Sequence, residues 1–372
     1  MKKKSFYILA LAALAVSCTN DELTTNETNA VVGFHALTSG VTTRAVNETN
    51  SVNLKDSPFD VYAFTETDGK LFIGKSLSES DYELSQGVEI RHNGSAWDYA
   101  NPADKAYWPT DKKLNFFAFH PQPDPSGGYS VEVFSASKQV VRYSVPTNAK
   151  FQKDLMYAIS RGVDKNTNAG KVKILFKHAL SQACFKAKTE MESMRVDVED
   201  IQIHNIAVDG DLTLPQTGTD ISMKDWNTQE KKHIAFEPKN LETPVMEIGT
   251  EAKELTGKMY LPQELTKWTP ENPETKTIDQ ANKEKQSYLS VLCKIKQNGV
   301  YLWGSEEKAW RLFVPFGVKW EPGKRYVYTL IFGGGYKDDG TQVLDQIKWE
   351  VEEMPWQDAP YDVNADTNVN VN

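Results

Sequence analysis

The sequence predicts an all-β protein, and three observations support this prediction. Helical periodicity is almost absent, and short runs rich in β-forming residues are separated by Gly, Pro, Asn and Asp throughout the chain. Asp68-Gly69, Asn93-Gly94 and Asn298-Gly299 each stand between two such runs, and these dipeptides supply the positive φ angles of a tight hairpin. The length of 372 residues suits two domains of ordinary size.

The chain begins with a segment typical of a lipoprotein signal peptide, residues 1–17. It contains three lysines, an apolar run from Phe6 to Val16 and the small Ser17, and the run is too short to span a bilayer. Cys18 follows at the expected cleavage site, an arrangement that resembles a lipobox, in which this Cys is lipidated. "TNDE" after it resembles an acidic signal for export to the cell surface. An ordinary cleaved signal with an incidental Cys is the alternative.

An isolated strand follows this leader. Residues 18–29 are polar and patternless, which predicts a tether. The next residues alternate, and the side chains predicted to share one face are Ala30, Val32, Phe34 and Ala36. "NETN" stands on each side of the strand, and the polar segment after it contains "TTRA", with Arg44 and Ala45. One strand is therefore set between two polar segments.

The strands that follow are predicted to form two sandwiches. The first covers residues 30–165, and the polar stretch "RGVDKNTNAGK" predicts a domain boundary. The second covers residues 170–358 and begins with a long strand, whose change of apolar phase predicts a bulge near Ser181-Gln182. Residues 262–286 are rich in Thr, Glu, Lys and Pro, which predicts a long surface loop.

The last residues, 359–372, form a tail with a strict alternation. Every even position from Asp362 to Asn372 is Asp or Asn. The odd positions predicted to face a core are Val363, Ala365, Thr367, Val369 and Val371. This pattern predicts a strand with one face against a core and the other in water. A solvated terminus that alternates by chance is the alternative.

Composition and motifs favour neither catalysis nor nucleic-acid binding. The net charge is −9 and Lys and Arg are spread along the chain, whereas phosphate binding needs clustered cations. The six histidines are scattered, and hydrolase and nucleotide-binding signatures are missing. Cys184 and Cys293 cannot build a Cys-based metal site; they either pair or remain buried thiols. We therefore expect no enzyme activity, no cofactor and no metal.

Several motifs in their order along the chain resemble a known family. They are the lipobox, "TTRA", "AYWPTDKKLNFFAFHP", "QKDLMYA", "KILFKHALSQACFK", "WEPGKRYVYTL" and "IKWEVEEMPW". Together they resemble the fimbrillin-like (Mfa-like) proteins, the type V pilins of Bacteroidales, over nearly the whole chain. The resemblance implies two tandem transthyretin-like β-sandwiches.

The same resemblance implies a function in surface fimbriae and cell adhesion. Pilins of this family reach the outer membrane as lipoproteins, where an arginine-directed protease removes the lipidated piece with its first strand. In this sequence, cleavage would follow Arg44, leave Ala45 as the new N-terminus and discard the strand around Ala30 to Leu37. The tail of another fimbrial subunit, identical or different, would then fill the open groove.

A lipid-anchored surface protein that binds glycans through exposed Trp and Tyr is the alternative function. Core packing is nevertheless the commoner role for aromatic residues in or beside strands. The aromatic residues in such positions are Trp97, Tyr107, Trp108, Trp320, Trp349 and Trp356. The short segment after the last predicted strand leaves open whether the subunit belongs to the stalk, the tip or the anchor of a fibre.

Overall fold

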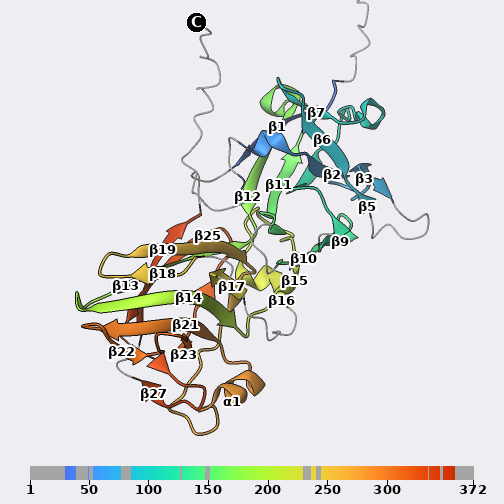
Figure 1. Cartoon of the computed structure of the whole chain (residues 1–372). Coiled ribbons are helices and arrows are strands. Elements are labelled where there is room, and N and C mark those ends of the chain that lie inside the picture. The colour runs from blue at the N-terminus through green and yellow to red at the C-terminus, as the bar shows by residue number, and fades with distance from the viewer. Residues whose placement is uncertain are drawn as a thin grey trace, which may run out of the picture.

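The computed structural model describes residues 30–38, 49, 53–76, 85–125, 128–146, 151–228, 236–239, 244–333, 335–343 and 347–356. Strands are the dominant regular structure among these residues, with little helix, so the all-β prediction is confirmed. Four sheets of four or more strands account for most of them (Figure 1). In Figure 1, β1, β2, β6 and β7 lie at the top and the strands β13, β14, β21 and β25 lie below.

The N-terminal sheet of eight strands closes on itself. Its order is β3-β2-β6-β7-β1-β12-β11-β8, and β8 also pairs with β2, so all its strands except β3 form a closed ring. The bounds are β1 (Gly33–Thr38), β2 (Phe59–Thr65), β3 (Leu71–Ile73), β6 (Val88–His92), β7 (Trp97–Tyr99), β8 (Leu114–His120), β11 (Met156–Val163) and β12 (Lys171–His178). Side chains that point into the ring, such as Val61, Phe116 and Ile174, form one hydrophobic core.

Three further sheets lie among the described residues. One has the order β16-β15-β10-β9 and contains β9 (Tyr129–Phe134), β10 (Gln139–Ser144), β15 (Asp209–Thr213) and β16 (Trp226–Thr228). A second has the order β19-β13-β25-β28 and contains β13 (Ser181–Thr189), β19 (Lys253–Tyr260), β25 (Lys324–Phe332) and β28 (Lys348–Pro355). The third, with the order β17-β14-β21-β23-β26-β27, contains β14 (Met194–His204), β17 (Phe236–Lys239), β21 (Tyr288–Gln297), β23 (Trp310–Pro315), β26 (Gly335–Tyr336) and β27 (Gln342–Val343).

Short elements complete the described structure. β18 (Met246–Ile248) pairs with β14, and β22 (Val300–Trp303) pairs with β21. Two-stranded ribbons join β4 (Lys75–Ser76) to β5 (Ser85–Gln86) and β20 (Gln263–Glu264) to β24 (Lys319–Trp320). The helical elements are α1 (Ile278–Lys283) and short 3-10 turns at Leu54–Asp56, Pro102–Asp104, Thr167–Gly170 and Met223–Asp225.

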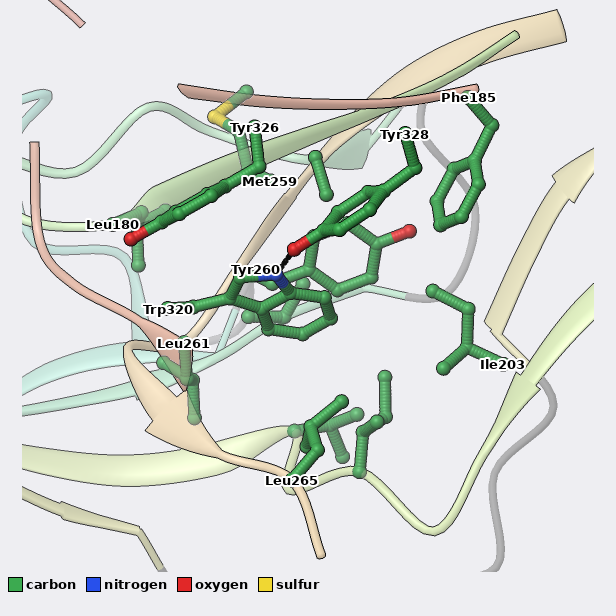
Figure 2. Close-up of a cluster of buried hydrophobic side chains, with 14 of the residues drawn as sticks. Leu180, Phe185, Ile203, Met259, Tyr260, Leu261, Leu265, Trp320, Tyr326 and Tyr328 are labelled. Carbon is green, nitrogen blue, oxygen red and sulfur yellow. Dashed lines mark hydrogen bonds between the residues drawn. The ribbon is translucent and has the colours of Figure 1, made fainter. Parts of the chain in front are cut away.

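The C-terminal sheets share a core that is rich in aromatic side chains. Trp320 is fully buried, and its Nε1 donates a hydrogen bond to the hydroxyl of Tyr328 at 2.9 Å (Figure 2). The ring centroid of Tyr260 lies 4.6 Å from that of Trp320, and Phe185 stacks on Tyr328 at 5.4 Å. Each such aromatic pair contributes about 0.5–1.5 kcal/mol beyond its buried area. Burial raises the pKa of Tyr328, so its hydroxyl stays neutral.

All three predicted hairpins are present. Gly69, Gly94 and Gly299 have φ angles of 64°, 97° and 81°, which favour glycine. They lie between β2 and β3, between β6 and β7, and between β21 and β22. The Asp-Gly and Asn-Gly signals were therefore sufficient to place these turns.

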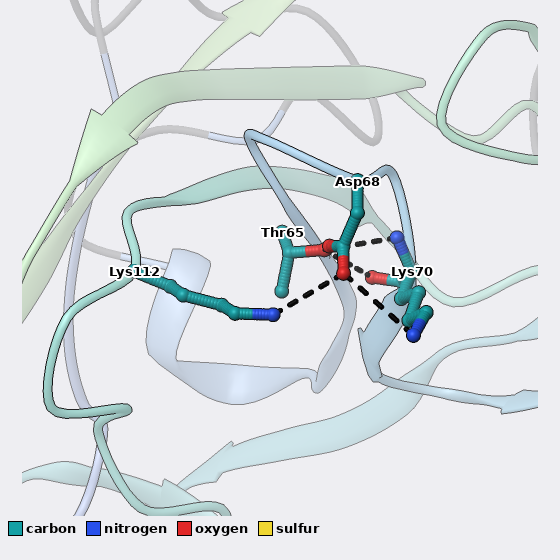
Figure 3. A network of polar contacts seen from close by, with 4 residues as sticks. All are labelled: Thr65, Asp68, Lys70 and Lys112. Carbon is teal, nitrogen blue, oxygen red and sulfur yellow. Dashed lines mark hydrogen bonds and ion pairs between the residues drawn. The ribbon is translucent and has the colours of Figure 1, made fainter.

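The turn between β2 and β3 is fixed by the side chain of Asp68 (Figure 3). The hydroxyl of Thr65 donates to this carboxylate, and Lys112 Nζ lies 3.2 Å from its Oδ2. These hydrogen bonds lower the pKa of Asp68 to about 2, so the carboxylate remains ionised in mild acid. Local side-chain bonds of this kind select the turn geometry.

The predicted long strand with a bulge near Ser181-Gln182 is instead two strands in different sheets. β12 ends at His178, Ala179 and Leu180 cross between the sheets, and β13 begins at Ser181. The apolar phase changes because the two halves face different cores.

Strand pairing also crosses the predicted boundary between 165 and 170, since β12 pairs with β1 and β10 pairs with β15. The limits of the two domains therefore stay a prediction.

The prediction of a surface loop over residues 262–286 is wrong in part. Trp268 within it is fully buried, and its ring lies 5.8 Å from that of Tyr288. Helix α1 starts with a capping box between Thr277 and Gln280. Trp268 packs with the buried Ile278, Ala281 and Tyr288, and these apolar side chains hold the segment in place.

A buried polar cluster lies where β12 leaves the ring. His178 Nδ1 is 3.0 Å from Asp154 Oδ2, and both side chains are almost fully buried. The backbone N–H of Thr49 donates to the same Oδ2 at 2.9 Å. The ring of Trp356 stacks on His178 with 4.0 Å between centroids. The cluster therefore links Thr49, which follows Arg44 in the sequence, to Trp356, which precedes the tail.

We predict that His120, beside this cluster, makes the fold sensitive to acid. Burial lowers the pKa of His120 to about 4, although the charge of Asp154 opposes this shift. The imidazole of an unfolded chain has a pKa of about 6.5, so between about pH 6.5 and 4 the unfolded chain binds more protons than the folded chain. The free energy of unfolding therefore falls as the pH is lowered through this window, by up to about 1.4 kcal/mol per pH unit. Urea unfolding at pH 7 and pH 5 should show a smaller loss of stability for His120→Gln. Equal losses in both proteins would contradict the prediction.

Candidate functional site

The candidate site is the place in the ring that β1 occupies, between β7 and β12. β1 runs parallel to β12, with residue pairs from Gly33 opposite Lys171 to Thr38 opposite Phe176. On its other side the ladder with β7 contains the single antiparallel pair Phe34 and Trp97. One edge of β1 is thus paired throughout its length, and the other edge is paired with β7 at one point only.

The residues just before β1 are held by a different segment. The N–H of Val32 donates to the carbonyl of Ala106 at 2.9 Å, and the N–H of Trp108 donates to the carbonyl of Ala30 at 2.9 Å. The indole Nε1 of Trp108 donates to the carbonyl of Gly170 at 2.9 Å, which fixes this segment next to β12. The segment that contains Ala106 and Trp108 is therefore joined both to the start of β1 and to Gly170, which precedes β12.

The structure places most of the predicted β1 face in the ring core. Val32, Phe34 and Ala36 are 0%, 4% and 7% exposed, whereas Ala30 is exposed because it precedes the strand. The ring of Phe34 lies 5.5 Å from Tyr99 and 6.5 Å from Phe59. Removing a buried Phe side chain typically costs about 3–5 kcal/mol. β1 is therefore an integral part of this core.

The outer face of β1 borders a small cavity. Gly33, His35 and Leu37 point outward and are partly exposed. The cavity has a volume of about 160 Å³ and lies beside β1 near the turn between β6 and β7. Its lining residues are Phe34, His35, Ala36, Leu37, Leu54, Lys55, His92, Ser95, Ala96, Trp97 and Lys171. It opens where β1 and β7 do not pair.

The other predicted site residues fall into two groups. Cys18, Arg44, Ala45 and the tail positions from Val363 to Val371 lie outside the described residues. Cys184 and Cys293 are described, and both are buried free thiols. Burial raises the pKa of Cys293, which keeps it protonated. The alternative of a disulfide between them does not hold in this structure.

Sequence reasoning missed the buried Asp154–His178 pair. Both residues lie in motifs that were noted for their order. His178 continues the inward alternation of Val172, Ile174 and Phe176, but no periodic signal marks Asp154 as a buried carboxylate. Only the burial of both side chains identifies the pair. Asp154 of this pair also accepts a hydrogen bond from the backbone of Thr49, which follows Arg44 by five residues in the sequence.

A second cavity bears on the glycan-binding alternative. It has a volume of about 500 Å³, and its lining residues are Asp60, Lys75, Gln86, Gly87, Glu89, Arg91, Ala100, Asn101, Asp104 and Gln122. Gln122 Nε2 donates to Asp60 Oδ1 at 2.6 Å, and burial raises the pKa of Asp60. No lining residue is aromatic, so the cavity lacks the flat apolar face on which sugar rings stack.

The part of the chain that the structure describes contains no group of three or more His, Cys, Asp or Glu side chains that could hold a metal ion. None of its helices has the length and apolar character needed to cross a bilayer.

Comparison with known proteins identifies the family. A family model described as fimbrillin-like matches residues 43–354. A fimbrial protein from Bacteroides vulgatus has 13% sequence identity and a TM-score of 0.58, over 88% of this chain and 100% of that one. A candidate cell adhesion protein from Bacteroides ovatus has 14% identity and a TM-score of 0.44, over 88% and 97% of the two chains. No curated protein matches the sequence. Because the family model covers most of its length, the chain belongs to the fimbrillin-like family.

Proposed function

We propose that the chain is a non-enzymatic structural subunit of a cell-surface fimbrium, made as an outer-membrane lipoprotein precursor and polymerised by strand exchange. Membership of the fimbrillin-like family supports the fimbrial role. Cys18 directly after the apolar leader supports a lipid anchor. The observation that carries the proposal is the burial of β1 in the ring core, because a single cut after Arg44 would separate this strand from the rest of the chain.

Proteolysis by an arginine-directed outer-membrane protease would change how β1 is held. Before the cut, the covalent link keeps β1 at a high effective concentration next to β12. After the cut, only non-covalent contacts retain it: the ladder with β12, the single pair with β7, the backbone hydrogen bonds of Ala30 and Val32, and the apolar contacts in the core. The family match begins at residue 43, next to Arg44, so the matched region does not include β1. Loss of β1 leaves a groove with exposed apolar side chains and unpaired backbone groups, which favours a replacement strand.

The tail has the pattern that such a groove requires. Val363, Ala365, Thr367, Val369 and Val371 would enter the core while Asn and Asp face solvent. Burial of each valine contributes about 1.5–3 kcal/mol before the cost of ordering the tail. Backbone pairing with β12 adds to this. The tail of a neighbouring subunit, identical or different, is therefore the proposed donor.

The glycan-binding alternative has less support. The Trp and Tyr side chains that the structure describes as exposed are Trp310, on β23, and Tyr107, in the segment before β8. Trp310 belongs to a sheet of the C-terminal half, whereas Tyr107 lies outside the named strands and forms an isolated bridge with Val31, so they do not form one platform. Trp97, Trp108, Trp320 and Trp356 are buried.

We predict that cleavage after Arg44 starts assembly. The purified precursor, treated with an arginine-specific protease at low dose, should lose β1 and then form ladders on unheated gels. Mass spectrometry should find Ala45 at the new N-terminus. Arg44→Gln removes the cleavage site and should leave the protein monomeric. Ladders formed by this variant, or an N-terminus elsewhere, would disprove the processing step.

We predict that Val363→Asp combined with Val369→Asp abolishes the ladders, because two carboxylates would have to enter the core of the next subunit. Asn364→Asp combined with Asn370→Asp adds the same charge on the outward face and should still assemble. Thermal unfolding of the uncut precursors should be the same for both variants. If the valine variant still formed ladders, the tail would not be the donor.

We predict that Cys18→Ala releases the protein from the membrane, since a free leader without lipid has no stable anchor. Fractionation of cells and labelling with palmitate measure this change. The neighbouring Ser17→Ala variant should keep both the label and the membrane fraction. Palmitate labelling of the Cys18→Ala protein would rule out the lipoprotein assignment.

A further inference from the structure

We infer that Lys171 and Lys173 of β12 bind Asp362 and Asp366 of the incoming tail of a second copy, and that these ion pairs select the donor strand and its register. The inference rests on the proposed function. It concerns the row of side chains that faces solvent, whereas the exchange itself depends on the row that faces the core.

β12 presents a row of lysines along the groove edge. Its outward positions begin with Lys171 and Lys173, which are exposed, while Val172 and Ile174 between them are buried. Among the residues that the structure describes, neither lysine forms an ion pair. By contrast, Lys177 at the other end of the strand lies 2.6 Å from Asp220 Oδ1. The two positive charges nearest the start of β1 are therefore available.

β1 does not neutralise these charges. In the ladder, Gly33 lies opposite Lys171 and His35 lies opposite Lys173, so the outward row of β1 carries no carboxylate. The Nε2 atom of His35 is also buried without a hydrogen-bond partner among the described residues. An unsatisfied buried polar atom is unfavourable. On its outer face, β1 is therefore a poorly matched occupant of the groove.

The cavity beside β1 has the same charge. Lys55 and Lys171 line it, and its lining contains no Asp or Glu. This local surface contrasts with the net charge of −9 of the whole chain. The acidic residue nearest along β7, Asp98, forms an ion pair with Lys105 at 3.5 Å. The rim of the groove is thus locally positive in an acidic protein.

The tail carries the complementary charge. Residues 357–372 contain three Asp and neither Lys nor Arg. If the odd positions of the tail face the core, Asp362 and Asp366 point outward, on the same side of the sheet as Lys171 and Lys173. Opposite charges on adjacent strands stabilise the pairing, and like charges destabilise it.

One register aligns the first half of the tail with β1. In a parallel strand, Ala365 can take the position of Ala36 and Thr367 that of Thr38, so that the same small residues are buried. Asp362 then replaces Gly33, where a Cβ atom would lie 3.3 Å from Cγ of Lys171, a tight contact that requires the flexible Lys171 side chain to shift slightly. Asp366 replaces Leu37, diagonally across from Lys173. Exchange would therefore replace a neutral outward row with an acidic one.

The test compares ladder formation by variants after the cut at Arg44. Lys171→Glu combined with Lys173→Glu should assemble about 10-fold more slowly at low salt, because two attractive pairs become repulsive. The matched control, Lys113→Glu with Lys138→Glu, changes two exposed lysines away from the groove and should assemble within about twofold of the wild-type rate. Adding Asp362→Lys and Asp366→Lys to the first variant should restore assembly.

The outcomes separate this inference from the proposed function. If the Lys171/Lys173 variant assembles at the wild-type rate, or if the charge swap does not restore assembly, the inference is wrong while strand exchange stands. If the cut wild-type protein forms no ladders, the proposed function itself fails. Should the glutamate variant unfold, Lys171→Gln with Lys173→Gln replaces it. This variant should lose most of the salt dependence of the wild-type rate, and an unchanged salt dependence would overturn the inference.

Discussion

The parallel ladder between β1 and β12 is the pairing on which the N-terminal ring depends. β1 supplies Val32, Phe34 and Ala36 to the core, and it separates β7 from β12. Without it, both neighbours become edge strands, and the core opens between them. A strand that closes a ring in this way would ordinarily stay covalently joined to the other strands of its sheet. Here it precedes a polar segment with one arginine, so the strand that closes the ring is also the strand that the proposed cut after Arg44 would separate from the chain.

β12 connects this ring to the other half of the molecule. The strand pairs with β1 from Lys171 to Phe176, and at its C-terminal end His178 contacts Asp154 and stacks on Trp356. Asp154 also accepts a hydrogen bond from the backbone of Thr49, beyond the arginine. A cut after Arg44 would therefore free β1 but leave Thr49 fixed at the end of β12. Thr49, which follows the proposed cut, and Trp356, which precedes the tail, would both stay in contact with the buried Asp154–His178 pair.

The sequence predicted local features well and long-range pairing poorly. The Asp-Gly and Asn-Gly turns fix their hairpins through backbone conformation alone, and the alternation around Phe34 identifies its buried face. Alternation does not mark where a strand begins, so Ala30 was assigned to the core although it precedes β1. The closure of the ring and the change of sheet at Ala179 depend on partners far along the chain. Strand periodicity contains no information about such partners.

A strand that joins another subunit can carry two kinds of information on its two faces. The inward face must fit a core, and small or branched apolar residues satisfy many cores about equally well, so this face discriminates weakly between donors. The outward face remains in water and is free to vary without loss of packing. Charges placed there affect the rate of encounter and exclude wrong partners more than they add affinity. In this proposal the two faces of the tail have different roles. Its valines would fit the core, and the ion pairs of its Asp residues with the exposed Lys171 and Lys173 on β12 would select the donor strand.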